Sequence, residues 1–77
     1  MDIHIQLYSN LREKLPQGSK GKAVLHLKDE ASLQDLLDEL EITQKIVISV
    51  NNEQETDTSR RLQNGDNVKM FSSISGG

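Results

Sequence analysis

The residues of this chain that could most directly do chemistry are the last two, Gly76 and Gly77. Because neither has a side chain, the pair could enter a narrow channel and present the terminal carboxylate of Gly77 to another protein's active site. A glycine pair is also costly in entropy to order and gains nothing from packing, so a frayed terminus or a cloning remnant is the simpler alternative. The elements that precede the pair must decide between the two.

Other chemistry is sparse in the sequence. There is no cysteine, which excludes a disulfide, a thiolate zinc site, an iron–sulfur cluster and a cysteine nucleophile. The two histidines, His4 and His26, fall on the polar sides of predicted strands, and their spacing does not indicate a metal site. The carboxylates of residues 34–41 are most simply a solvated helix face. We therefore expect no bound metal or cofactor.

Length and charge narrow the function further. A chain of 77 residues forms one domain and has no large cavity for a substrate, which favours a binding or carrier module over a self-contained enzyme. The net charge of −3 and the presence of only two aromatic residues, Tyr8 and Phe71, argue against nucleic acid as a partner. We see neither a signal peptide nor an apolar stretch able to span a membrane, and the lack of cysteine fits a cytoplasmic protein.

The first half of the chain predicts two strands and two helices. Residues 3–8 and 22–28 alternate between apolar and polar side chains, which predicts two strands that pair antiparallel. Between them, residues 10–15 predict a short helix with Asn10 as its N-cap, ended by Pro16. The clearest helix opens at Ser32, which forms a near capping box with Asp35. Its apolar stripe consists of Leu33, Leu36, Leu37 and Leu40.

The second half predicts three more strands. The β-branched run 46–50 is followed by a turn at Asn51 and Asn52 and then by a short polar edge strand at 53–56. Leu62 is an isolated apolar residue, Gly65 supplies a second turn, and 68–71 predict the last strand. One amphipathic helix must bury its stripe against the sheet. The expected fold is therefore α+β, a mixed four- to five-stranded sheet packed on one main helix in the β-grasp, or ubiquitin-like, arrangement.

Three segments give the chain a specific resemblance. They are residues 7–13, Val50-Asn51-Asn52, and Leu62-x-x-Gly65-Asp66-x-Val68 followed by the terminal glycine pair. In this order and spacing, they are similar to the MoaD/ThiS family of sulfur-carrier proteins. The opening segment is closer to the MoaD type, the small subunit of molybdopterin synthase, than to the thiamine type. The chain departs from the family pattern at Asn52, where glycine is usual, and at Ser72 and Ser73, where MoaD-type members often have two prolines. We assign residues 1–72 to the β-grasp domain and 73–77 to a flexible tail.

The resemblance implies a mechanism centred on Gly77. An activating enzyme of the MoeB/ThiF type would adenylate the Gly77 carboxylate with ATP, and a sulfur donor protein would convert the product to a thiocarboxylate. A larger subunit of the MoaE type, or another acceptor enzyme, would then receive the sulfur in molybdopterin (molybdenum or tungsten cofactor) biosynthesis. The chain itself would be a carrier and not an enzyme, with no bound cofactor.

The same resemblance suggests which residues bind the partners. Gly76 would provide clearance, and Ile74 and Phe71 would be apolar docking contacts, although Phe71 could equally belong to the core. Arg60 and Arg61 could meet an acidic patch of the activating enzyme, although a solvated loop is the simpler reading.

Three other functions stay open at this point. The chain could carry sulfur for thiamine, cysteine or tRNA thiolation. It could be a ubiquitin-like modifier conjugated through Gly77 to lysines, or an interaction domain without C-terminal chemistry.

Overall fold

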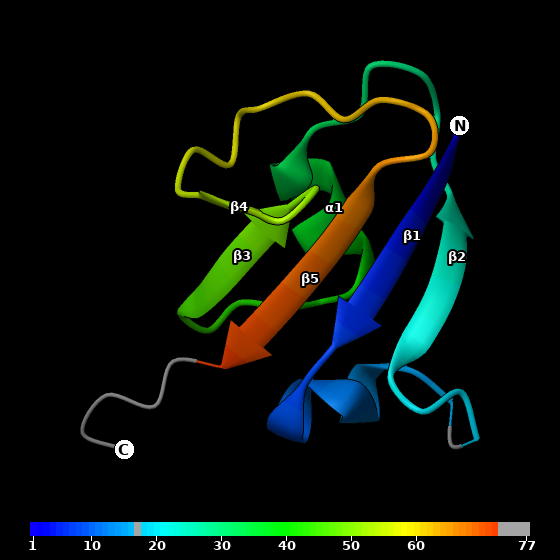
Figure 1. Ribbon diagram of the computed structural model, residues 1–77, viewed down its shortest axis with the longest axis vertical. Helices are drawn as coiled ribbons and strands as arrows, with labels where there is room; N and C mark the ends of the chain where they lie inside the picture. Colours follow the sequence, from blue (N-terminus) through cyan, green and yellow to red (C-terminus); the bar gives the residue numbers. More distant parts are fainter. Residues whose placement is uncertain (17, 73–77) are drawn as a thin grey trace.

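The computed structural model describes residues 1–16 and 18–72, which form a five-stranded mixed sheet and two helices (Figure 1). The strands lie in the order β2-β1-β5-β3-β4. Their bounds are Asp2–Leu7 for β1, Lys22–His26 for β2, Ile46–Val50 for β3, Glu53–Glu55 for β4 and Asn67–Ser72 for β5. A 3-10 helix, η1, spans Ser9–Lys14, and the α-helix, α1, spans Leu33–Glu39.

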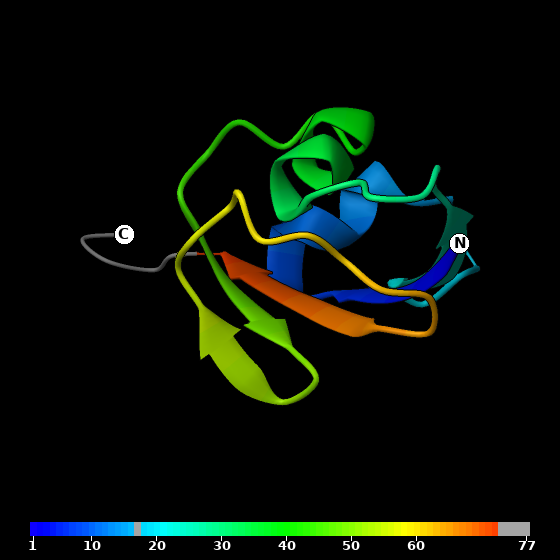
Figure 2. The same ribbon diagram turned by 90° about the horizontal axis from the view of Figure 1, so that it is seen from above.

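The first and last strands lie side by side in the centre of the sheet. β1 pairs with β5 in parallel, whereas the other neighbours, β1 with β2, β5 with β3 and β3 with β4, are antiparallel. Figure 2 shows α1 and η1 on the same side of the sheet, which leaves the other side without a helix. This arrangement confirms the predicted β-grasp fold. The expected flexible tail, 73–77, lies outside the described residues.

The core lies between the sheet and α1. Leu33 and Leu36 of the predicted stripe are fully buried, and Leu37 and Leu40 are buried almost as completely. They meet the inward residues of the strands, because alternate side chains of a strand point to the same face. The strand residues buried in this way are Ile3, Ile5, Leu7, Ile48, Val50, Val68 and Met70. Leu62, from the long connection before β5, is also buried in this core.

The start of α1 confirms the capping box predicted from the sequence. The Asp35 backbone N–H donates to Ser32 Oγ at 3.2 Å, and the Ser32 N–H donates to an Asp35 carboxylate oxygen at 2.9 Å. Two backbone donors that the helix itself leaves unpaired are thereby satisfied. An aspartate can thus close the box in this chain, although its side chain is shorter than the usual glutamate.

The prediction that Asn10 caps the first helix is wrong. η1 begins one residue earlier, at Ser9, after an extended Tyr8, and no side chain caps it. Its first turn is closed by the backbone, since the Leu11 N–H donates to the Tyr8 carbonyl oxygen at 3.1 Å. Leu11 is buried and holds this turn against the core. The Asn10 side chain is left free for another contact, described below.

Candidate functional site

The C-terminal end of β5 is the end of the described chain, and its strand pairing fixes where Ser72 lies. On one side, Phe71 and Ser72 pair with Val47 and Ile46 of β3, and on the other side β5 pairs with β1 up to Met70. Beyond this point the Tyr8 N–H donates to the Met70 carbonyl oxygen at 3.1 Å. In Figure 1, β5 runs through the middle of the sheet and ends near η1. The last strand is therefore held by neighbours on both sides almost to its final residue.

Phe71 lies on the sheet face opposite α1 and not in the core. Its ring stacks on that of Tyr8, with centroids 4.4 Å apart and planes inclined by 12°. Phe71 is 36% exposed, and its β3 partner Val47 is 41% exposed. We call Tyr8, Val47 and Phe71 the exit patch. Phe71 therefore does not belong to the core, and it forms an apolar surface beside Ser72, the last described residue.

The polar contact at this exit comes from Asn10. Ser72 Oγ donates to Asn10 Oδ1 at 2.8 Å, which joins the last residue of β5 to η1. The sequence pattern predicted Asn10 as a helix cap and gave no indication of this pairing. A local pattern holds no signal for it, because the two residues are far apart in the chain and are brought together only by the parallel pairing of β1 with β5.

The other three predicted site residues, Ile74, Gly76 and Gly77, lie outside the described residues. Their roles remain predictions. Of the predicted site, the structure therefore places Phe71 alone, at the surface next to the last described residue, Ser72.

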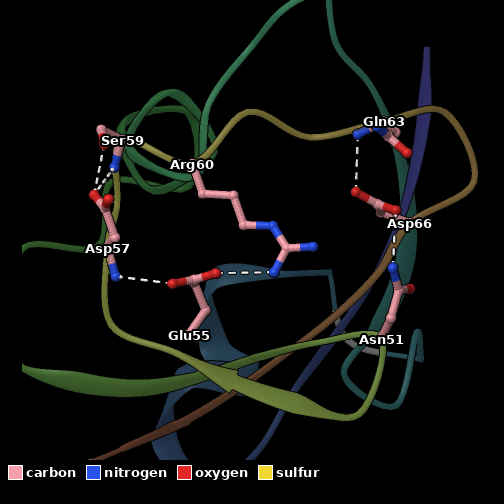
Figure 3. A network of polar contacts seen from close by, with 7 residues as sticks. All are labelled: Asn51, Glu55, Asp57, Ser59, Arg60, Gln63 and Asp66. Atoms are coloured by element: carbon pink, nitrogen blue, oxygen red, sulfur yellow. Dashed lines mark hydrogen bonds and ion pairs between the residues drawn. The ribbon is translucent and has the colours of Figure 1, made fainter.

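The Gly65-Asp66 motif lies at the opposite end of β5 and has a structural role. The buried Asp66 carboxylate accepts hydrogen bonds from Asn51 Nδ2 at 3.0 Å and from the Gln63 N–H at 2.8 Å (Figure 3). Asn51 also accepts from the Asn67 N–H at 3.0 Å. These bonds tie the β3–β4 turn to the start of β5. The motif therefore positions β5 and supplies no reactive group at the exit.

Arg60 and Arg61 both form ion pairs with glutamates of the same chain. Its guanidinium donates to Glu55 Oε1 at 2.8 Å (Figure 3), and this hydrogen bond is the main cause that holds the pKa of Glu55 below its ordinary value. Next to it, hydrogen bonds from Ser59 lower the pKa of Asp57. Arg61 pairs with Glu30 at 2.7 Å, with both side chains largely exposed. Arg60 thus stabilises the loop, and neither arginine provides an unpaired cation for a partner.

The described residues offer little for metal or cofactor chemistry. Within 1–16 and 18–72, no three His, Asp or Glu side chains gather where they could hold a metal ion. His26 Nδ1 lies 3.0 Å from Asp2 Oδ1, a surface pair that lowers the pKa of Asp2 mainly through the hydrogen bond. Over the same part of the chain, no helix has the length and apolar character needed to cross a bilayer.

The fold and the held exit of β5 define a small ubiquitin-like β-grasp protein. A model of the ThiS family matches residues 5–77, nearly the whole chain, so the chain belongs to the ThiS family, as its motifs indicated. No curated protein matches the sequence in a direct search.

Solved structures of low sequence identity share the fold. Small archaeal modifier protein 1 from Haloferax volcanii superimposes with a TM-score of 0.73, 18% identity and full coverage of both chains. A protein described as molybdopterin converting factor subunit 1 from Pyrococcus furiosus gives a TM-score of 0.77 at 16% identity, covering 96% of this chain and 99% of its own. A complex of subunits 1 and 2 of the molybdopterin-converting factor from Helicobacter pylori contains a chain similar at 13% identity, with a TM-score of 0.68 and full coverage of both chains.

Proposed function

We propose that this protein is a sulfur carrier whose Gly77 carboxylate is converted to a thiocarboxylate and donates its sulfur in molybdopterin biosynthesis. The observation that carries the proposal is the exit of β5. The strand is clamped up to Ser72 beside the apolar exit patch, and five residues ending in two glycines follow it in the sequence. Fully extended, five residues span at most about 18 Å, which is enough to reach into a partner's active site.

The chemistry requires a partner at each step. A carboxylate is a poor electrophile, so the activating enzyme joins the Gly77 carboxylate to the AMP moiety of ATP and releases pyrophosphate. A sulfur donor protein then delivers sulfur at the oxidation level of sulfide, which attacks the acyl carbon and displaces AMP. The resulting thiocarboxylate transfers its sulfur to the acceptor, and an oxygen from water restores the carboxylate. ATP is a substrate of the activating enzyme in this scheme, and the carrier needs no resident cofactor.

In this proposal the carrier is a co-substrate and not an enzyme. Its partners are an activating enzyme of the MoeB/ThiF type, a sulfur donor protein and a larger synthase subunit of the MoaE type. The Helicobacter pylori complex of subunits 1 and 2 supports the last partner by analogy of fold. The exit patch would lie against these enzymes while Ile74 and Gly76 lead Gly77 into their active sites. With these partners, we propose that the protein acts in the cytoplasm.

Two alternatives keep the same tail. The match to small archaeal modifier protein 1 favours, as a second function, a ubiquitin-like modifier joined through Gly77 to lysines of other proteins. A carrier for thiamine, cysteine or tRNA thiolation would use the same thiocarboxylate with a different acceptor.

Intact-mass spectrometry tests the carrier chemistry. After incubation with the activating enzyme of the same organism, ATP and a sulfur donor, the protein should gain the mass difference between one sulfur and one oxygen. A variant lacking Gly77 should not gain it, and omitting ATP should abolish the gain in the intact chain. An unchanged mass, together with normal pathway function of the variant lacking Gly77, would refute the carrier function.

A second measurement separates the acceptors. Thiocarboxylated protein mixed with the larger synthase subunit and the molybdopterin precursor should yield molybdopterin. If the thiocarboxylate forms but yields none, the acceptor belongs to another thiolation pathway. The modifier function instead predicts Gly77–lysine isopeptides in cell lysates, detectable by digestion and mass spectrometry.

A further inference from the structure

A shallow groove crosses the sheet face that no helix covers. It spans β2, β1 and β5 and has a volume of about 380 Å³. Its outward-facing side chains are those of His4, Gln6, Lys22, Val24, Asn67 and Lys69. We call it the sheet groove. None of these residues was assigned a function from the sequence.

The strand register sets two lysines on either side of one glutamine. Gln6 pairs with Lys22 of β2 on one side and with Lys69 of β5 on the other. Neighbouring strands lie about 4.8 Å apart, so the two lysine backbones stand roughly 10 Å from each other. The next row of the groove holds His4 between Val24 and Asn67. Two lysines therefore flank the hydrogen-bonding side chain of Gln6.

The groove is cationic although the protein is acidic. No carboxylate lines it, and within the described chain Lys22 and Lys69 form no ion pair, in contrast to Arg60 and Arg61. Asp2, on the same face of β1, lies beyond His4 and pairs with His26. Many of the carboxylates instead occur on α1 and its flanking turns, at Asp29, Glu30, Asp35, Asp38, Glu39 and Glu41. The two faces of the molecule thus differ in the sign of their charge.

The sheet groove continues into the exit patch. Along β1 the outward residue after Gln6 is Tyr8, and along β5 the outward residue after Lys69 is Phe71. Figure 1 shows β1 and β5 side by side along this path. A protein that covers Phe71 to receive the tail therefore also reaches Lys22 and Lys69.

We propose that the sheet groove binds an acidic strip, a run of Asp and Glu side chains, on the enzyme that activates Gly77. Two lysines without a neighbouring carboxylate complement such a strip, and the acidic α1 face would repel it, which fixes one orientation of docking. The same acidic face and the net charge of −3 disfavour a nucleic acid in the groove. The naming of the activating enzyme rests on the proposed function, whereas the acidic character of the ligand rests on the groove alone.

Charge reversal at the groove provides the first test. Lys22→Glu and Lys69→Glu should each raise the KM of the activating enzyme for this protein about five-fold while kcat stays unchanged, because rim charges act mainly on encounter. Lys28→Glu, an exposed lysine past the end of β2 on the helix side, makes the same change in net charge and should alter KM less than about two-fold. Added salt should raise the KM of the wild type more than that of Lys69→Glu. Equal effects of all three variants would overturn the proposal.

A second test needs no enzyme. A short polyglutamate peptide titrated into the isotopically labelled protein at low salt should shift backbone resonances of Lys22, Gln6 and Lys69 and leave those of α1 unchanged. Shifts spread evenly over the surface, or none at all, would refute the acidic ligand. Thermal unfolding of each variant, with Lys69→Gln as a milder change, checks that the sheet is intact. If the peptide binds in the groove but the protein is never adenylated, the proposed function fails and the groove assignment stands.

Discussion

Ser72 Oγ donates a hydrogen bond to Asn10 Oδ1 at 2.8 Å across 62 residues of sequence. This contact ties the last described residue of β5 to η1, one residue after Phe71, whose ring stacks on that of Tyr8. The end of the last described strand is therefore held by a side-chain hydrogen bond to a segment that is distant in the sequence.

A double-mutant cycle measures that contact. Ser72→Ala and Asn10→Ala should each lower the free energy of unfolding by about 0.5 kcal/mol, because an exposed hydrogen bond contributes little beyond its exchange with water. The double variant should lose no more than either single one, since both remove the same bond. Urea unfolding of the four proteins gives the coupling energy. Fully additive losses would show that the bond does not form in solution.

The two asparagines of the β3–β4 turn should respond oppositely to glycine. Both have positive φ, 52° at Asn51 and 71° at Asn52. Asn52→Gly should stabilise the protein by less than about 1 kcal/mol, because glycine adopts this conformation without a Cβ conflict. Asn51→Gly should instead cost about 1–3 kcal/mol, since it leaves the buried Asp66 carboxylate without one of its donors. Urea unfolding at neutral pH compares them, and a loss of equal size at both positions would contradict this account.

Gly21 and Gly18 form a second matched pair, in the connection between η1 and β2. Both have positive φ, but a Cβ at Gly21 would collide with the Leu7 carbonyl oxygen, whereas a Cβ at Gly18 meets nothing. Gly18→Ala should cost about 1–2 kcal/mol, the penalty for a left-handed alanine. Gly21→Ala should cost clearly more, because the backbone of β1 must also move. Thermal unfolding measures the difference in stability between the two variants. Equal losses would show that the backbone near Gly21 can move away from an added Cβ at no further cost.

The Glu55–Arg60 pair should make the free energy of unfolding depend on pH in the acidic range. The hydrogen bond from Arg60 lowers the pKa of Glu55 from its ordinary value of 4.5, so the folded state binds fewer protons than the unfolded state just below that pH. The stabilisation is complete above the unfolded pKa and is lost as the pH falls through the lowered folded value. Glu55→Gln should therefore flatten the decline of unfolding free energy between about pH 5 and pH 3.

The control for this prediction is Glu53→Gln on the same strand. Within the described chain, the Glu53 side chain makes no hydrogen bond or ion pair, so this variant should keep the wild-type pH dependence. If both variants flatten the curve equally, the acid sensitivity arises from overall charge and not from Arg60.

Local patterns in the sequence were enough to predict the elements and the fold class. The alternation of Ile3, Ile5 and Leu7 predicted a strand with one buried face, and the leucine spacing predicted the buried side of α1. These signals work because burial repeats with the period of the element itself. The capping box at Ser32 was equally visible, since its two partners are three residues apart.

The side-chain contacts at the end of β5 could not be predicted from local sequence patterns. The Tyr8–Phe71 stack and the Asn10–Ser72 bond depend on the parallel register of β1 and β5, which are joined by most of the chain. A residue's own neighbours in sequence do not encode that register, so Phe71 could be assigned neither to the core nor to the surface. For the same reason Asn10, whose side chain is typical of a helix cap, was predicted to cap η1 instead of bonding to Ser72.

Phe71 offers the most direct functional test among the described residues. If the exit patch docks on the activating enzyme, Phe71→Ala should raise the KM for this protein about ten-fold or more, because exposed aromatic residues often dominate binding energy. Phe71→Tyr, which retains a ring able to stack on Tyr8, should keep KM close to the wild-type value. Initial rates of pyrophosphate release at varied protein concentration give KM and kcat separately. A fall in kcat at unchanged KM would assign Phe71 to aiming the tail instead of docking, and equal behaviour of the alanine and tyrosine variants would remove the exit patch from the interface.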